Sequence, residues 1–136
     1  ETGGGALMNG KPVSVDPGTD LQHGLTSVGA NFRVPVAVIS SFIHNLLEAG
    51  GMFVRSGSGA LSLAHVACGR LAAYYEPHMN AWDCLAAQCL IREAGGFVGD
   101  LDGGPDAMET GNVVAGNAKL FEPLGELLRA AGGSGK

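Results

Sequence analysis

Two acidic residues seven positions apart, Glu76 and Asp83, are the strongest chemical feature of this sequence. They belong to the segment YYEPHMNAWD, in which Glu76 ends a predicted strand and Asp83 lies in the first turn of a predicted helix. Open α/β sheets bind ligands where strand ends border helix N-termini. Two carboxylates at such a position can hold a divalent cation or accept hydrogen bonds from a hydroxylated ligand.

Each of these acidic residues also has an ordinary structural explanation. An Asp in a first helical turn satisfies free backbone N–H groups and complements the helix dipole. A Glu at a strand end is commonly a solvated side chain. Spacing alone leaves both explanations open. The functional interpretation is favoured by the joint setting, in which Glu76 and Asp83 flank one turn.

A glycine-rich turn, Ser56-Gly57-Ser58-Gly59, provides a second candidate feature. It follows a predicted strand and precedes the helical pattern ALSLAHVACGR. The backbone N–H groups at such a helix start can bind an anion. Alternatively, Ser58 simply caps the helix, which is an equally good interpretation. A dinucleotide site is not expected, because the third glycine of that fingerprint is absent.

Strands and helices alternate along the rest of the chain. Residues 1–16 predict a hairpin around Asn9-Gly10, since both residues tolerate positive φ. The alternation predicts an α/β fold, a layered sandwich with a mostly parallel or mixed sheet flanked by helices. We expect strands at Leu25–Gly29, Met52–Val54, Ala72–Glu76, Phe97–Leu101 and Val113–Ala115, and helices at Val36–Ala49, after the glycine-rich turn, at Ala81–Ala94 and at Leu120–Ala131.

Composition narrows the function classes. The chain has 136 residues, which suits one domain. It has 13 acidic against 8 basic residues and no basic cluster, which argues against a nucleic-acid partner. The longest apolar run, Val34–Ile39, is too short to cross a bilayer, so we expect a soluble, cytoplasmic protein with no membrane partner. Only 15% of residues are charged, where about 25% is usual. This composition indicates a surface that another polypeptide covers.

Individual side chains carry further expectations. The odd set Cys68, Cys84 and Cys89 lacks a CxxC pair, so these residues are expected to be small buried apolar groups. His65 is expected to be a core residue of an apolar helix. Trp82 is expected to pack beneath the site and to aim Asp83.

Two further features concern acidic side chains. Glu93 lies in a last helical turn, where its charge opposes the helix dipole, so a compensating hydrogen bond is expected. Asp100, Asp102, Asp106 and Glu109 have the composition of a calcium loop, but Pro105 stands where such a loop needs glycine. We therefore expect a polar turn there.

The segment Arg55–Gly103 resembles the inositol monophosphatase family of Mg²⁺-dependent, lithium-sensitive sugar-phosphate phosphatases. Trp82–Gly96 matches the family signature WDxxAxxxxxxEAGG. Glu1–Gly10 and the segment GNVVAGN at Gly111–Asn117 are also similar to family segments. The resemblance covers nearly the whole chain but only the C-terminal half of the family, and it implies the C-terminal half of an αβαβα fold.

The resemblance also implies roles for particular residues. Asp83 becomes a metal ligand and catalytic residue, Glu76 contacts substrate hydroxyl groups, and the backbone near Gly59 and Ala60 approaches the substrate. Gly59 stands where Ala is common in the family, and Ala72 where many members carry Asp. The cofactor implied is Mg²⁺. The other family ligands come from an upstream Glu and a DPxDGT-type motif, neither of which occurs here.

As a whole, the chain is expected to hydrolyse inositol monophosphate or a related small sugar or polyol phosphate only together with complementary sequence. Residues 1–16 would be a hairpin of the N-terminal half's sheet, 17–131 the C-terminal phosphatase domain and 132–136 a flexible tail. The partner would be that half or a second copy in a homodimer. Fructose bisphosphate, a nucleotide and histidinol phosphate are alternative substrates. A non-catalytic interaction or oligomerisation module is the competing function.

Overall fold

The computed structural model describes residues 2–99 and 113–132. The four acidic residues considered as a calcium loop and residues 133–136 of the predicted tail lie outside this part. The elements are β1 (Ala6–Met8), β2 (Lys11–Val13), β3 (Leu25–Val28), α1 (Val36–Glu48), β4 (Met52–Val54), α2 (Gly59–Ala67), β5 (Ala73–Glu76), α3 (Ala81–Glu93), β6 (Gly96–Val98), β7 (Val113–Asn117), the 3-10 turn η1 (Ala118–Leu120) and α4 (Phe121–Ala130).

The central sheet is mixed, with the strand order β4-β3-β5-β7-β6. β3 runs parallel to β4 and β5, whereas β7 runs antiparallel to β5 and β6. Parallel neighbours need a crossover, and here helices α1 and α2 supply it. The predicted fold class, an α/β fold with a mixed sheet and flanking helices, is confirmed.

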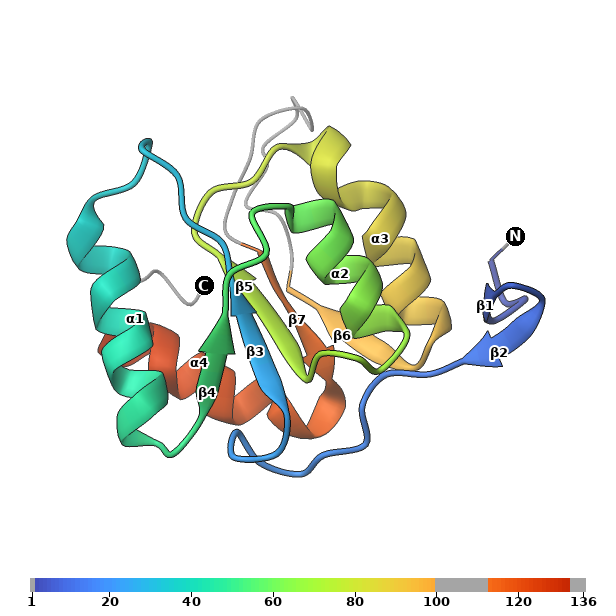
Figure 1. Cartoon of the computed structure of the whole chain (residues 1–136), viewed down its shortest axis with the longest axis horizontal. Helices are drawn as coiled ribbons and strands as arrows, with labels where there is room; N and C mark the ends of the chain where they lie inside the picture. The colour runs from blue at the N-terminus through green and yellow to red at the C-terminus, as the bar shows by residue number, and fades with distance from the viewer. Residues whose placement is uncertain (1, 100–112, 133–136) are drawn as a thin grey trace.

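Helices cover both faces of this sheet (Figure 1). One face packs against α2 and α3, and its core includes Leu63 and Ile91. The other packs against α1 and α4 and includes Phe42 and Leu46. Spacings of three and four residues put one face of each helix inward. None of the described helices is long and apolar enough to cross a bilayer.

The last strand is longer than its prediction. β7 continues past Ala115 to Asn117, because Gly116 and Asn117 still have partners on the neighbouring strands. Gly116 lies opposite Ala73 on one side and Phe97 on the other. The last strand in sequence lies inside the sheet, as the short apolar run Val113–Ala115 predicts.

The N-terminal hairpin stands apart from the five-stranded sheet (Figure 1). Its turn is the predicted one, since Asn9 and Gly10 both have positive φ, 53° and 77°. The Glu93 carboxylate, at the end of α3, accepts hydrogen bonds from the N–H groups of Gly3 at 2.7 Å and Gly5 at 2.8 Å. The compensating hydrogen bond expected for Glu93 is thus confirmed, and it fastens the hairpin to this helix.

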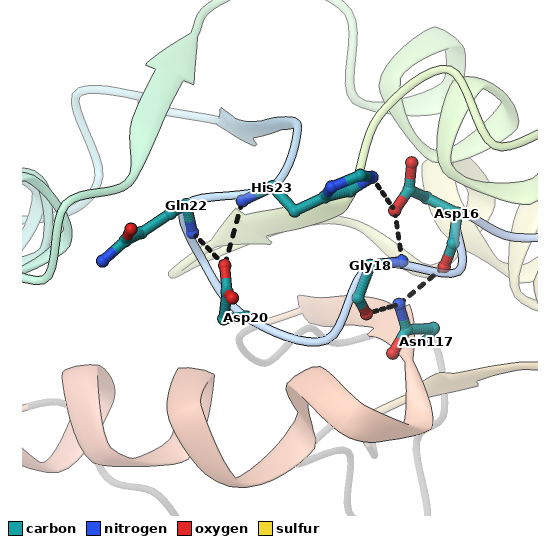
Figure 2. Close-up of polar contacts among 6 residues, drawn as sticks. All are labelled: Asp16, Gly18, Asp20, Gln22, His23 and Asn117. Atoms are coloured by element: carbon teal, nitrogen blue, oxygen red, sulfur yellow. Dashed lines mark hydrogen bonds and ion pairs between the residues drawn. The ribbon is translucent and has the colours of Figure 1, made fainter.

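The linker between the hairpin and β3 is tied to the end of β7 by one side chain. The Asn117 amide donates to the carbonyl oxygens of Asp16 at 2.6 Å and Gly18 at 2.8 Å (Figure 2). The Asn117 side-chain oxygen accepts from the Lys119 N–H at 2.9 Å. Asp16 and Asp20 turn the linker locally by accepting backbone N–H groups. A nearly buried amide therefore joins the first linker to the last strand.

Three expectations about single side chains are wrong. Trp82 is 64% exposed, because α3 turns Ala81 and Cys84 to the core at a spacing of three and leaves the intervening side chain outside. Cys89 is exposed on the same helix, although Cys84 is buried as expected and Cys68 is half-buried. His65 is half-buried in the last turn of α2 and is not a core residue.

Candidate functional site

A cleft of about 410 Å³ opens at the edge of the sheet where the parallel strands β3, β4 and β5 end. In Figure 1 this is the upper edge, to which the arrowheads of these strands point. The cleft contains all four residues that the sequence proposes for a site: Gly59, Ala60, Glu76 and Asp83. Its lining is Asn31, Phe32, Arg33, Gly57, Ser58, Gly59, Ala60, Glu76, His78, Met79, Asn80 and Asp83.

The start of α2 presents backbone N–H groups to this cleft. Ser58 caps the helix, because its hydroxyl accepts from the Leu61 N–H at 3.3 Å and its carbonyl accepts from Ser62. The capping interpretation of Ser58 is therefore confirmed. It leaves the N–H groups of Gly59 and Ala60 without a hydrogen bond to any described residue, so both can receive an anion or a hydroxyl oxygen.

Asp83 lies exposed in the first turn of α3. Within the part of the chain that the structure describes, its carboxylate contacts no backbone N–H and accepts only from the Asn80 amide, at 3.4 Å. Asn80 also accepts from Arg33 at 3.3 Å, which places a cation on the same side of the cleft. The arrangement does not fit a plain helix cap, since among the described residues the carboxylate accepts from no backbone N–H and it lines the cleft.

Glu76 is half-buried at the end of β5 and is held by two donors. The Asn31 amide donates to Oε1 at 3.2 Å, and the Tyr74 hydroxyl donates to Oε2. The same Asn31 amide donates to the His78 carbonyl at 2.8 Å, which connects the loops that follow β3 and β5. Glu76 is therefore a fixed side chain and not a freely solvated one.

Burial shapes the electrostatics beneath the cleft. It raises the pKa of the Tyr74 hydroxyl far above its ordinary value, and the hydrogen bond to Glu76 and the charge of Glu76 raise it further. Tyr74 thus stays protonated and acts as a permanent donor. Burial also raises the pKa of the Cys84 thiol, which lies one residue after Asp83.

A smaller polar cavity of about 70 Å³ adjoins the cleft and shares Gly59 and Glu76 with it. Its wall contains a chain of hydroxyl groups in which Ser27 donates to Ser62 at 3.0 Å and Ser62 lies 2.6 Å from Ser56. Ser56 in turn donates to the Ser58 carbonyl. These hydroxyls hold the glycine-rich turn in place over β3.

Sequence reasoning missed several residues of the site. Asn31 and Arg33 lie in the loop after β3, and Tyr74 lies two positions before Glu76. A signal was present for Tyr74, because residues two apart in a strand face the same side. For Asn31 the signal was weaker: its loop follows a parallel strand and so reaches the same sheet edge as Glu76.

The residues present fit one part of a magnesium site. Mg²⁺ takes oxygen ligands and keeps several waters, and the exposed Asp83 carboxylate offers such a ligand within a cleft. Among the described residues, however, no group of three His, Cys, Asp or Glu side chains gathers closely enough to hold a metal ion. Asp83 can therefore be one ligand, and further ligands have to come from elsewhere.

Two curated proteins illustrate the sequence similarity of this chain to known proteins. An inositol-1-monophosphatase of Mesorhizobium japonicum is 41% identical over 133 residues, covering 91% of this chain and 47% of the relative. The Nus factor SuhB of Escherichia coli is 36% identical over 124 residues, covering 90% of this chain and 46% of the relative. The chain spans about half the length of the curated relatives it matches.

Solved structures of other proteins have a similar fold. The extragenic suppressor protein suhB of Bartonella henselae has a TM-score of 0.81 at 31% identity, over 96% of this chain and 50% of that one. An inositol monophosphatase of Anabaena has a TM-score of 0.80 at 34% identity, over 93% of this chain and 51% of that one. Residues 1–132 match the family described as "Inositol monophosphatase family". This chain belongs to the inositol monophosphatase family.

Proposed function

We propose that this chain forms one half of a metal-dependent phosphomonoesterase that hydrolyses inositol monophosphate or a related small polyol phosphate. Asp83 serves as a ligand of Mg²⁺ and as a catalytic residue. Glu76 accepts hydrogen bonds from the substrate's hydroxyl groups, and the N–H groups of Gly59 and Ala60 contact the substrate. A complementary half supplies the other metal ligands, so the chain alone is inactive.

The observation that carries this proposal is the convergence of Gly59, Ala60, Glu76 and Asp83 on one cleft. They come from the end of one strand, β5, and the starts of two helices, α2 and α3. The lining is polar and holds both carboxylates and a guanidinium group. Such a lining suits a small ligand that carries an anionic group and several hydroxyl groups.

Bound Mg²⁺ would activate a water molecule as the nucleophile and neutralise charge on the phosphate. The chain's own residues bind and orient the ester beside it. Asp83 keeps acceptor positions open toward the cleft, because Asn80 occupies only one of them. Glu76 and the start of α2 hold the polyol portion and so fix the direction of the scissile bond.

The experiment is an assay for phosphate release from myo-inositol 1-phosphate with Mg²⁺. The chain is assayed alone and then together with the complementary half of the Mesorhizobium relative. We expect no turnover by the chain alone and Mg²⁺-dependent turnover by the assembled protein. Ordinary enzymatic activity of the chain alone would contradict the half-site, and absence of activity from a folded assembled protein would contradict the phosphatase.

Asp83→Asn tests the metal role in the assembled protein. We expect it to lower kcat by about 100-fold or more, since it removes a charged ligand of the catalytic ion. Asp20→Asn is the matched control, because it removes the same charge from the linker that precedes β3, at the opposite end of the strands from the cleft. Equal losses from the two variants would show a general effect of charge and not a metal ligand at Asp83.

An interaction module is a second candidate function, favoured by one specific observation. Large apolar side chains lie on the surface, with Phe32 97%, Val36 82% and Met52 61% exposed. Exposed apolar groups of this size indicate a surface that a partner covers. The two functions are compatible if the partner is the half that completes the site.

A further inference from the structure

The Glu76 carboxylate accepts hydrogen bonds from two side chains, and these contacts explain how it can select a substrate. We propose that Tyr74 is a positioning residue: its hydroxyl, together with the Asn31 amide, clamps Glu76 so that this carboxylate recognises the hydroxyl groups of a polyol phosphate. This inference rests on the function proposed above and adds the residues that set its specificity.

The alternation of β5 creates the first half of the clamp. Tyr74 and Glu76 are two positions apart, so their side chains lie on the same face of the sheet, whereas Tyr75 lies on the opposite face. Tyr74 belongs to the core beneath α2 and α3, and Tyr75 packs on Phe42 with ring centroids 4.2 Å apart. Only Tyr74 can therefore reach the Glu76 carboxylate.

The second half of the clamp comes from the loop after β3. Asn31 donates to Glu76 Oε1 and to the His78 carbonyl, and its own oxygen accepts from the Arg33 N–H at 2.9 Å. Asn31 is itself fixed in this way by two loops. Its contact prevents the Glu76 carboxylate from turning about its last torsion angle.

Two glycines make room for the paired side chains. A Cβ at Gly29 would lie 2.6 Å from the Tyr74 hydroxyl, and a Cβ at Gly59 would lie 2.9 Å from it. Both distances are shorter than van der Waals contact, so a larger residue at either position would displace the hydroxyl. The close approach of these two backbone segments is therefore part of the clamp.

The clamp leaves the carboxylate able to accept further hydrogen bonds. Each carboxylate oxygen has two acceptor positions, and Tyr74 and Asn31 occupy one on each. Because the side chain is already ordered, binding a substrate hydroxyl costs little additional entropy. Removing the Tyr74 hydroxyl should thus weaken recognition of hydroxyl groups and leave phosphate chemistry intact.

The test compares two phosphate esters in the assembled protein. myo-Inositol 1-phosphate carries hydroxyl groups, and p-nitrophenyl phosphate carries none near its ester. We expect Tyr74→Phe to raise KM for the inositol ester about tenfold, because a hydrogen bond to a charged group is lost. The kcat/KM value for the nitrophenyl ester should stay within about twofold of its starting value.

Tyr75→Phe is the matched control, since it deletes the same atom from the neighbouring tyrosine, which is equally buried. It should change neither KM for the inositol ester nor kcat/KM for the nitrophenyl ester. In a Glu76→Gln background, Tyr74→Phe should have no further effect on the ratio of the two esters, because the group that it positions has been altered. A tenfold effect that persists in this background would overturn the proposal.

A spectroscopic measurement separates this inference from the proposed function. With ¹³C-labelled glutamate, Tyr74→Phe should shift the Glu76 carboxyl signal, and Tyr75→Phe should leave it in place. If the starting protein hydrolyses neither ester, the proposed function fails, while the Glu76 signal still tests the clamp. If it hydrolyses both esters, and Tyr74→Phe changes their kinetic constants equally or not at all, the positioning role fails.

Discussion

Among single residues, Gly59 and Tyr74 depend on each other. A Cβ at Gly59 would press on the end of Met79 and on the Tyr74 hydroxyl. The absence of a side chain at Gly59 therefore leaves room for the hydroxyl of Tyr74, which lies on β5 fifteen positions further along the chain.

This pairing predicts the outcome of a double-mutant cycle. We expect Gly59→Ala to destabilise the folded protein by about 1–2 kcal/mol through overpacking. Added to Tyr74→Phe, the same change should cost clearly less, because one of the crowding atoms is gone. Urea unfolding of the two single variants and the double variant measures this. Strictly additive effects would show that Gly59 and Tyr74 do not interact.

The sequence predicted the members of the site better than their contacts. Glu76 and Asp83 were identified because carboxylates stood at a strand end and a helix start. Asn31 was missed because its hydrogen bond to Glu76 joins positions 45 apart, and loop contacts of that separation leave no periodic signal. Trp82 was misplaced because its size suggested burial, whereas helical spacing decided the side on which it lies.

At the scale of elements, the end of α3 holds the N-terminal hairpin through Glu93. A two-stranded hairpin is marginally stable alone in water, and this one is also attached through the buried Ala6 and through Val13, which packs against the same core. The N–H groups of Gly3 and Gly5 lower the pKa of the Glu93 carboxyl below its ordinary value of 4.5. The attachment is therefore complete above pH 4.5 and is lost as the pH falls through the lowered pKa of the folded protein.

Glu93→Gln should release the hairpin at neutral pH. A glutamine side chain has one acceptor oxygen, so one of the two N–H groups loses its partner. We expect faster amide hydrogen exchange throughout residues 3–13, while exchange in the five-stranded sheet stays unchanged. Glu48→Gln is the matched control, because Glu48 also ends a 13-residue helix. The attachment is refuted if both variants exchange at the same rate.

Most elements were predictable from periodicity and turn chemistry. The dipeptide Asn9-Gly10 predicted the hairpin, and the helical spacing of Phe42 and Leu46 predicted α1. The order of strands was not predictable, because β7 enters between β5 and β6 through pairings of long sequence separation. The proposed membership of residues 1–16 in the sheet of another half stays a prediction, as does the homodimer.

At the scale of the whole molecule, exposed apolar side chains are the feature that supports the proposed association. The chain covers about half of its curated relatives, and residues such as Phe32 and Met52 are left largely uncovered. Among the described residues, the edge strand β4, which contains Met52, has no strand neighbour on one side. An uncovered edge with apolar side chains favours pairing with another polypeptide.

Sedimentation equilibrium tests this expectation. We expect the chain alone to self-associate, and to form a one-to-one complex when mixed with the complementary half of the Mesorhizobium relative. Binding of an apolar dye should fall in that complex, because the exposed surface becomes covered. Phe32→Ser combined with Met52→Ser should weaken the self-association. A monodisperse monomer that binds no dye would remove the basis for an interaction surface.

The bond from Asn117 to the linker has a bearing on biosynthesis. A ribosome releases residues 16 and 18 about a hundred positions before it adds residue 117. Since domains generally fold as units, the early linker and the interior of the sheet both wait for the final strand to emerge. Until then β5 and β6 lack β7, the strand that joins them in the sheet. Translation stalled shortly before residue 113 would leave a product that lacks both the β7 pairings with β5 and β6 and the hydrogen bonds from Asn117 to the linker.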